Sequence, residues 1–172
     1  MNMPIADERA TFDRGGESPE SGGWTVRRLL LLLVHVGIVG LLAELFLLGH
    51  TESATQWIPL VALAVGLASA LGVAVRATPG RLRAFQAVMG LFVVAGLLGL
   101  VLHYQGNAEF ELERHPAMGG LALFWEAVRG ATPALAPGAL AQLGLLGLIY
   151  TFHHPALARD VRGDSHPPRE KT

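Results

Sequence analysis

Hydrophobic residues in this chain gather into a few long runs instead of alternating with polar ones. The first run, residues 29–48, reads LLLLLVHVGIVGLLAELFLL and follows directly on Arg27 and Arg28. About 20 residues at about 1.5 Å per residue reach about 30 Å, the thickness of the hydrocarbon part of a bilayer. The segment before the run is acidic, unlike the short basic start of a signal peptide. We therefore expect a retained transmembrane helix over residues 26–49.

Three later apolar runs predict partners for this helix, at about 58–75, 84–104 and 137–154. The second and third predicted helices carry small residues that allow two helices to approach closely in lipid: Ala62, Gly66, Ala70 and Ala74, then Gly90, Gly96 and Gly99. Gln86 and Gln142 lie within apolar runs, where we expect them to hydrogen-bond between helices. The pattern predicts an all-α fold, an integral membrane four-helix bundle.

The connection between the third and fourth helices, residues 105–136, is the longest and changes character along its length. Its first part, QGNAEFELERHP, is strongly acidic. Its middle part places apolar residues on one side at helical spacing: Met118, Leu121, Trp125 and Val128. We expect a short interfacial helix in this outer connection, lying along the membrane surface.

Charge is distributed unevenly along the chain and predicts how it is oriented. Residues 1–23 and 156–172 are polar, so we expect disordered cytoplasmic tails around a transmembrane domain at 24–155. Eleven of the 13 Lys and Arg residues fall in the tails, directly before the first helix, or in the turn between the second and third. The positive-inside rule then places both termini in the cytoplasm of a bacterial-type inner membrane, which four crossings permit.

Composition narrows the possible functions without choosing one. Hydrophobic residues make up 51% of the chain and charged residues 16%, against about 25% charged in a soluble domain. The net charge of -1 offers no basic stripe for nucleic acid. Cysteine is absent, which excludes disulfides, thiolate metal sites and cysteine nucleophiles. No Walker loop or GxSxG motif occurs, so no enzyme class is indicated and no cofactor is required.

Glu44 is the acidic residue within the first apolar run. A charged carboxylate costs about 2.5–3.5 kcal/mol at mid-membrane and less near the interface, so we expect Glu44 to face the bundle beside Gly37 and Gly40. His103 lies at a comparable depth near the outer end of the third helix. A contact between Glu44 and His103 is our sharpest structural hypothesis, and it would make a proton- or cation-handling site. The alternative is a neutral or hydrogen-bonded Glu44 that braces the bundle.

His35 projects from the side of the first helix opposite Glu44, since nine residues make two and a half turns. It is a further ion or proton candidate, although we favour a neutral packing histidine. Together with His153 or His154 it would suggest haem ligation. His35 lies about 8–10 Å inside its helix whereas the other two lie at the membrane edge, so we expect no haem site.

Several carboxylates and imidazoles fall on the predicted outer surface and are candidate metal ligands: His50, Glu109, Glu111, Glu113 and His115. On an extended chain the three glutamates would share one face. Their spacing matches no metal-binding motif, and we favour a solvated acidic face.

Three functions from different classes therefore stay open. The leading one is a structural or accessory membrane subunit, whose partners are the lipid bilayer and a second copy of the chain or another membrane protein. The second is a small transporter that uses Glu44 and His103. The third is a metal- or haem-binding membrane protein.

Overall fold

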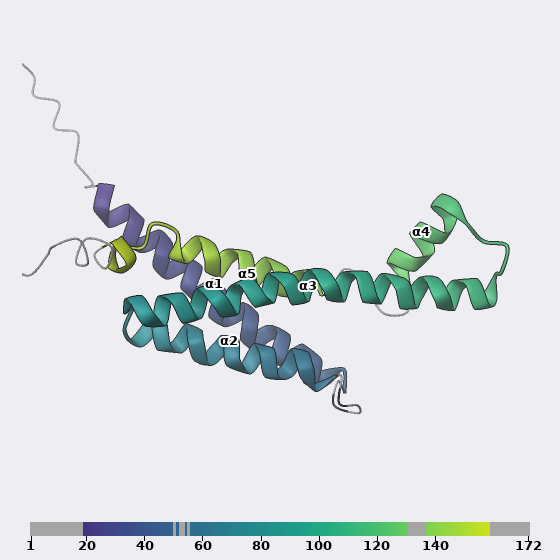
Figure 1. Ribbon diagram of the computed structural model, residues 1–172, viewed down its shortest axis with the longest axis horizontal. Coiled ribbons are helices and arrows are strands. Elements are labelled where there is room, and N and C mark those ends of the chain that lie inside the picture. Colours follow the sequence, from purple (N-terminus) through teal and green to yellow (C-terminus); the bar gives the residue numbers. More distant parts are fainter. Residues whose placement is uncertain (1–18, 50, 52–53, 55, 131–136, 159–172) are drawn as a thin grey trace, which may run out of the picture.

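The computed structural model describes residues 19–49, 51, 54, 56–130 and 137–158, all of whose regular structure is helical (Figure 1). Its elements are α1 (Pro19–Leu47), α2 (Trp57–Val75), α3 (Pro79–Arg114), α4 (Gly120–Arg129) and α5 (Gly138–Thr151). The predicted all-α class is confirmed, and helices α1, α2 and α3 are each long and apolar enough to cross a membrane. The fourth predicted helix, 137–154, is shorter in the structure: α5 ends at Thr151, has 14 residues and is about 21 Å long.

Four of the helices run back and forth along one axis, and α4 packs on the part of α3 that extends beyond the other three (Figure 1). The beginning of α1, the turn between α2 and α3, and the end of α5 share one end of the bundle, on the left in Figure 1. Helix α3 packs on α5 over its longest interface, while α1 contacts α2 and α5. No residue of α1 has its Cα within 8 Å of a residue of α3, so α5 and α2 separate these two helices.

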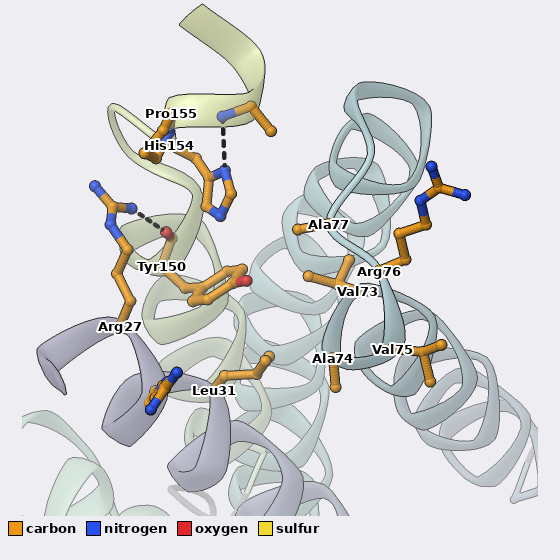
Figure 2. Close-up of a pocket in the computed structure, with 12 residues that line it drawn as sticks. Arg27, Leu31, Val73, Ala74, Val75, Arg76, Ala77, Tyr150, His154 and Pro155 are labelled. Atoms are coloured by element: carbon orange, nitrogen blue, oxygen red, sulfur yellow. Dashed lines mark hydrogen bonds between the residues drawn. The ribbon is translucent and has the colours of Figure 1, made fainter. Parts of the chain in front are cut away.

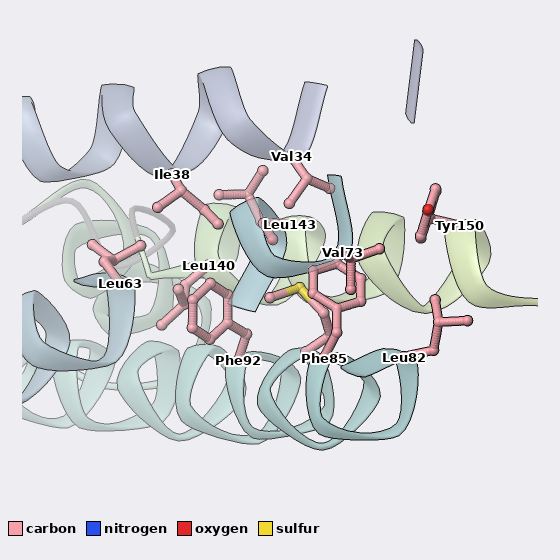
Figure 3. Packing of buried hydrophobic residues seen from close by; sticks show 12 residues of the cluster. Val34, Ile38, Leu63, Val73, Leu82, Phe85, Phe92, Leu140, Leu143 and Tyr150 are labelled. Carbon is pink, nitrogen blue, oxygen red and sulfur yellow. The ribbon is translucent and has the colours of Figure 1, made fainter. Parts of the chain in front are cut away.

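Large apolar side chains fill the space between the helices. Phe85, Met89 and Phe92 rise from α3 and are completely buried. Val34 and Ile38 point toward them from α1, as Figure 3 shows. In lipid, such burial stabilises a bundle mainly through close van der Waals packing, because the lipid tails are as apolar as the side chains.

Two glycines explain why α3 and α5 lie so close together. A Cβ atom on Gly96 would be 2.5 Å from the backbone nitrogen of Ala141, and one on Gly144 would be 2.5 Å from the carbonyl oxygen of Met89. Any larger residue would force the two backbones apart. The small residues predicted in α3 are thus used, in part, inside a single chain.

The remaining small residues of α2 and α3, and the polar residues within the apolar runs, give a mixed outcome. Gly66 packs against the Phe92 ring, whereas Gly90 has nothing within 4 Å of its would-be Cβ. Gln86 donates from Nε2 to Thr151 Oγ1 at 3.1 Å, which confirms its predicted bond between helices. Gln142 is exposed.

Helix α3 is longer at both ends than the predicted 84–104. It begins earlier because Pro79 suits the first turn and Thr78 caps it, accepting a hydrogen bond from the Arg81 amide at 3.4 Å. It continues to Arg114, and Pro116 follows shortly after its end. At about 1.5 Å per residue α3 measures about 54 Å, well beyond the hydrocarbon thickness of about 30 Å.

The predicted helix in the outer connection is present as α4, and it packs on the protruding part of α3. Asn107 of α3, itself buried, donates from Nδ2 to the carbonyl oxygen of Ala127 at 2.9 Å. Ala127 is buried against α3, while Leu121 and Trp125, from the predicted apolar side, are exposed. That side therefore faces away from α3, and Met118 precedes the helix.

The first helix differs from its predicted range of 26–49. It begins at Pro19, within the segment expected to be a disordered tail, and ends at Leu47. The remaining parts of both predicted tails, residues 1–18 and 159–172, lie outside the described residues, as does His50.

Candidate functional site

Glu44 and His103 are not brought together: neither side chain has a hydrogen bond or an ion pair with a described residue, and the backbones of α1 and α3 do not pack on one another. The expectation that Glu44 faces the bundle is wrong: its side chain is exposed. Gly37, seven positions earlier on the same side, packs against Leu143 of α5. Gly40 has nothing within 4 Å of its would-be Cβ. This side of α1 is therefore packed at Gly37 and open at Glu44.

His35 is a packing residue that keeps one unpartnered nitrogen. Its Nδ1 lies 2.7 Å from the Leu31 carbonyl oxygen, which can only accept, so Nδ1 carries the proton. The other ring nitrogen, Nε2, is buried without a hydrogen-bond partner. A ring held by a carbonyl of its own helix fits the packing histidine favoured from the sequence.

The three outer glutamates do not all share one face. They belong to helix α3, where residues two apart are separated by about 200°. Glu111 turns inward and lies 3.8 Å from Arg114, whereas Glu109 and Glu113 are exposed, as is His115. Across the described part of the chain, no group of three or more His, Asp or Glu residues is arranged to hold a metal ion.

A cavity of about 350 Å³ lies at the opposite end of the bundle, between the beginning of α1, the end of α2 and the segment after α5 (Figure 2). We call it the basic cavity. It is lined by Arg27, Arg28, Leu31, Val73, Ala74, Val75, Arg76, Ala77, Tyr150, His154, Pro155 and Ala156. Three of these residues are arginines and none is acidic, so its electrostatic potential is positive.

Arg27 builds one wall of the cavity by holding the end of α5. Its Nη1 donates to the carbonyl oxygens of Tyr150 at 2.7 Å and Phe152 at 3.1 Å, and its Nη2 donates to that of His153 at 3.1 Å. The last carbonyls of a helix lack partners within the helix and carry partial negative charge. A guanidinium has five N–H donors, so two of those on Arg27 stay available.

The turn after α5 aims His154 into the cavity. His153 adopts a left-handed conformation with φ of 48°, as is common just past a helix end, and the chain reverses there. The Ala156 amide donates to Nδ1 of His154 at 3.2 Å, which leaves the proton of the neutral ring on Nε2. In Figure 2 this second nitrogen points toward Tyr150, and no described residue bonds it.

Electrostatics keep His154 uncharged. Burial first, and then the positive charge of Arg27, lowers the pKa of His154 below its ordinary value of 6.5. His154 as a whole residue is only 4% exposed. At neutral pH the cavity therefore presents an N–H donor from His154 and fixed positive charge from the arginines.

The other two arginines are held less firmly. Arg28 and Arg76 are exposed, and the side chain of neither has a hydrogen bond or an ion pair with any described residue. Figure 2 shows Arg76 at the rim with its guanidinium turned outward. Both charges are therefore free to meet a ligand.

Sequence reasoning placed these arginines only as topology signals and missed the cavity. The contacts of Arg27 join residues at least 123 positions apart, and no local pattern indicates them. The sequence signals of this end are the Arg-Arg pair before one apolar run and the HHP triplet after another. No protein-family model, curated protein or solved structure matches the chain.

Proposed function

We propose that this chain is a multi-pass integral membrane protein of the cell membrane, with both termini cytoplasmic, and that it acts as a structural or accessory subunit. The carrying observation is the nature of the bundle interior. Its largest fully buried side chains, among the described residues, are apolar ones together with Thr151 at one end. Such an interior provides packing and no polar path.

The outer faces of the helices support a membrane setting. Exposed apolar side chains cover α1, α2 and α3, among them Val36, Val61 and Leu98. Within the apolar stretches of these helices, Glu44 is the one charged side chain, and it lies near the outer end. A bilayer would cover such faces, whereas water would penalise them.

The distribution of arginine supports the orientation. Arg27, Arg28, Arg76, Arg81 and Arg83 all belong to the end where α1 begins and α2 turns into α3. Arg114 and Arg129 belong to the opposite end, which also carries the outer glutamates. By the positive-inside rule the first end is cytoplasmic. The bond from Arg27 to His153 holds the beginning of α1 and the segment after α5 at the same end of the bundle.

Topology is tested with reporter fusions to the full chain. Reporters after Leu48 and after Pro116 should be active only outside the cytoplasm, and reporters after Ala77 and at the C-terminus only inside it. A C-terminal reporter that is active outside would contradict four crossings and the cytoplasmic C-terminus.

The accessory role is tested by separate measurements. Liposomes that contain the purified protein should show proton and cation flux no faster than empty liposomes. Flux that is present in the wild type and lost in Glu44→Gln would refute the accessory role and identify the protein as a transporter. In gently solubilised native membranes, the chain expressed at its natural level should migrate in a discrete larger complex. Migration at the mass of a lone chain would contradict a subunit role.

A further inference from the structure

The basic cavity joins two kinds of surface. One part consists of cationic and hydrogen-bonding groups from Arg27, Arg28, Arg76 and His154. The other part is apolar and comes from α1 and α2: Leu31, Val73, Ala74 and Val75. Val75 is 82% exposed, so the apolar part continues onto the outer surface of α2. A ligand that fits both parts is amphipathic, with an anionic group and a hydrocarbon group.

His154 adds a hydrogen-bond donor to the cationic groups of the cavity. The residue is 4% exposed, and its Nε2–H is directed toward the cavity without a partner in the described part of the chain. The oxygen of an anionic ligand can accept from this donor. The hydroxyl of Tyr150 also lines the cavity and has no bond to a described residue.

The position of the cavity identifies the source of the anionic group. Arg27 and Arg28 directly precede the apolar run of α1, and Arg76 directly follows that of α2. In a bilayer these arginines lie at the level of the lipid head groups. Basic pockets between transmembrane helices at this level suit phospholipid head groups, and guanidinium groups bind phosphate oxygens well.

We propose that the basic cavity binds the phosphate of one anionic phospholipid, with its acyl chains against the apolar surface of α1 and α2. Arg28 and Arg76 supply the mobile charges that close over the phosphate. His154 donates from Nε2 to a phosphate oxygen, and the two remaining N–H groups of Arg27 lie on the same wall. The site goes beyond the structural role proposed above and does not depend on it.

Native mass spectrometry of the purified full chain tests the site. The protein in mild detergent is titrated with dioleoyl phosphatidylglycerol and, in parallel, with dioleoyl phosphatidylcholine, which has the same acyl chains and no net charge. The double variant Arg28→Gln/Arg76→Gln removes two exposed, unpaired charges and leaves the packing intact. The control Arg114→Gln/Arg129→Gln makes the same change of charge at the opposite end of the bundle.

The wild type and the control should retain one phosphatidylglycerol in preference to phosphatidylcholine. The Arg28→Gln/Arg76→Gln variant should bind it about 30-fold more weakly, since each basic group near an anionic lipid contributes about fivefold. His154→Phe, which keeps a ring of similar size and removes the donor, should weaken binding by about fivefold. Circular dichroism on each variant confirms that its helices are intact.

Equal retention of the two lipids by the wild type would overturn the proposal. Equal weakening in the test and control variants would also overturn it, because net charge and not the cavity would then explain binding. A third arm adds millimolar glycerol 1-phosphate as a soluble competitor. Displacement of the lipid by glycerol 1-phosphate, at concentrations near the dissociation constant measured for glycerol 1-phosphate itself, would assign the cavity to a soluble phosphate. That result would refute the lipid-binding proposal.

Discussion

Arg27 donates a hydrogen bond of 2.7 Å to the backbone carbonyl oxygen of Tyr150, joining the beginning of α1 to the end of α5 across 123 positions. With its bonds to Phe152 and His153, it satisfies carbonyl groups that the helix itself leaves open. The other late carbonyls of α5 are bonded locally, those of Leu148 and Ile149 by the Phe152 amide. One side chain thus completes the end of the helix and closes the bundle.

Replacing Arg27 by Gln should lower stability by about 2 kcal/mol, because a charged donor to three backbone carbonyl groups is lost. Thermal unfolding in detergent, followed by circular dichroism, measures the change. Arg28→Gln is the matched control, since the exposed side chain of Arg28 has no hydrogen bond to a described residue. The unfolding midpoint of this control should stay at the wild-type value. Equal midpoints for both variants would show that the cap contributes nothing.

Stability should depend on pH through His154. Its folded-state pKa is lowered below 6.5, so the unfolded chain binds the proton more readily than the folded one. The contribution of neutral His154 is fully present above the unfolded pKa and is lost as the pH falls through the folded pKa. Besides burial, the positive charge of Arg27 opposes protonation of His154 in the same direction.

The measurement is the unfolding midpoint from about pH 8 to about pH 5. The midpoint of the wild type should fall on the acidic side of pH 6.5, and the His154→Gln variant should show a smaller fall, since it cannot gain this proton. Parallel curves for the two proteins would exclude His154 as the cause. Anionic lipid in the basic cavity should reduce the acidic loss, because a phosphate offsets the positive charge of a protonated ring.

Gly96→Ala should destabilise the contact between α3 and α5 by about 1–3 kcal/mol, because its Cβ would meet the backbone of Ala141. Backbone atoms cannot move aside as a flexible side chain does. Gly90→Ala on the same helix is the control, with nothing within 4 Å of its Cβ. Thermal unfolding should give a lower midpoint for the first variant and an unchanged or higher one for the second. The reverse order would contradict this packing.

His35→Leu should leave stability unchanged or raise it, because the variant removes a buried acceptor that lacks a partner. The unfolding midpoint and the absorption spectrum of the purified protein are compared with those of the wild type. A visible absorption band that is present in the wild type and absent in His35→Leu would instead identify His35 as a cofactor ligand.

Asn107→Leu should release α4 from α3 without disturbing the bundle. The variant loses the hydrogen bond to the Ala127 carbonyl oxygen. It also changes the side chain that lies in close contact with Gly130. Hydrogen exchange followed by mass spectrometry should show faster exchange in α4 and unchanged exchange in α2 and α5. Asn107→Asp keeps the shape and loses the donor, so it should resemble Asn107→Leu. Unchanged exchange in both variants would show that this bond does not hold α4.

Much of the helix content was predictable from the sequence, because long apolar runs require helices wherever backbone groups must bond internally. Helix limits were less predictable. Sequence reasoning ended the third helix at residue 104, since the acidic residues that follow are polar. Glutamate is nevertheless a good helix former, and the next proline is Pro116, so the helix continues to Arg114. Polarity marks where lipid ends and does not by itself end a helix.

The sequence alone determined the class of this protein: apolar stretches long enough to cross a membrane, a basic end and an acidic end. These properties depend on residue type and local spacing, which a chain carries without being folded. Tertiary structure decided which groups meet. It kept Glu44 and His103 apart, because the backbones of α1 and α3 do not pack on one another. It also joined Arg27 to the end of α5, since contacts between distant segments depend on how the helices pack.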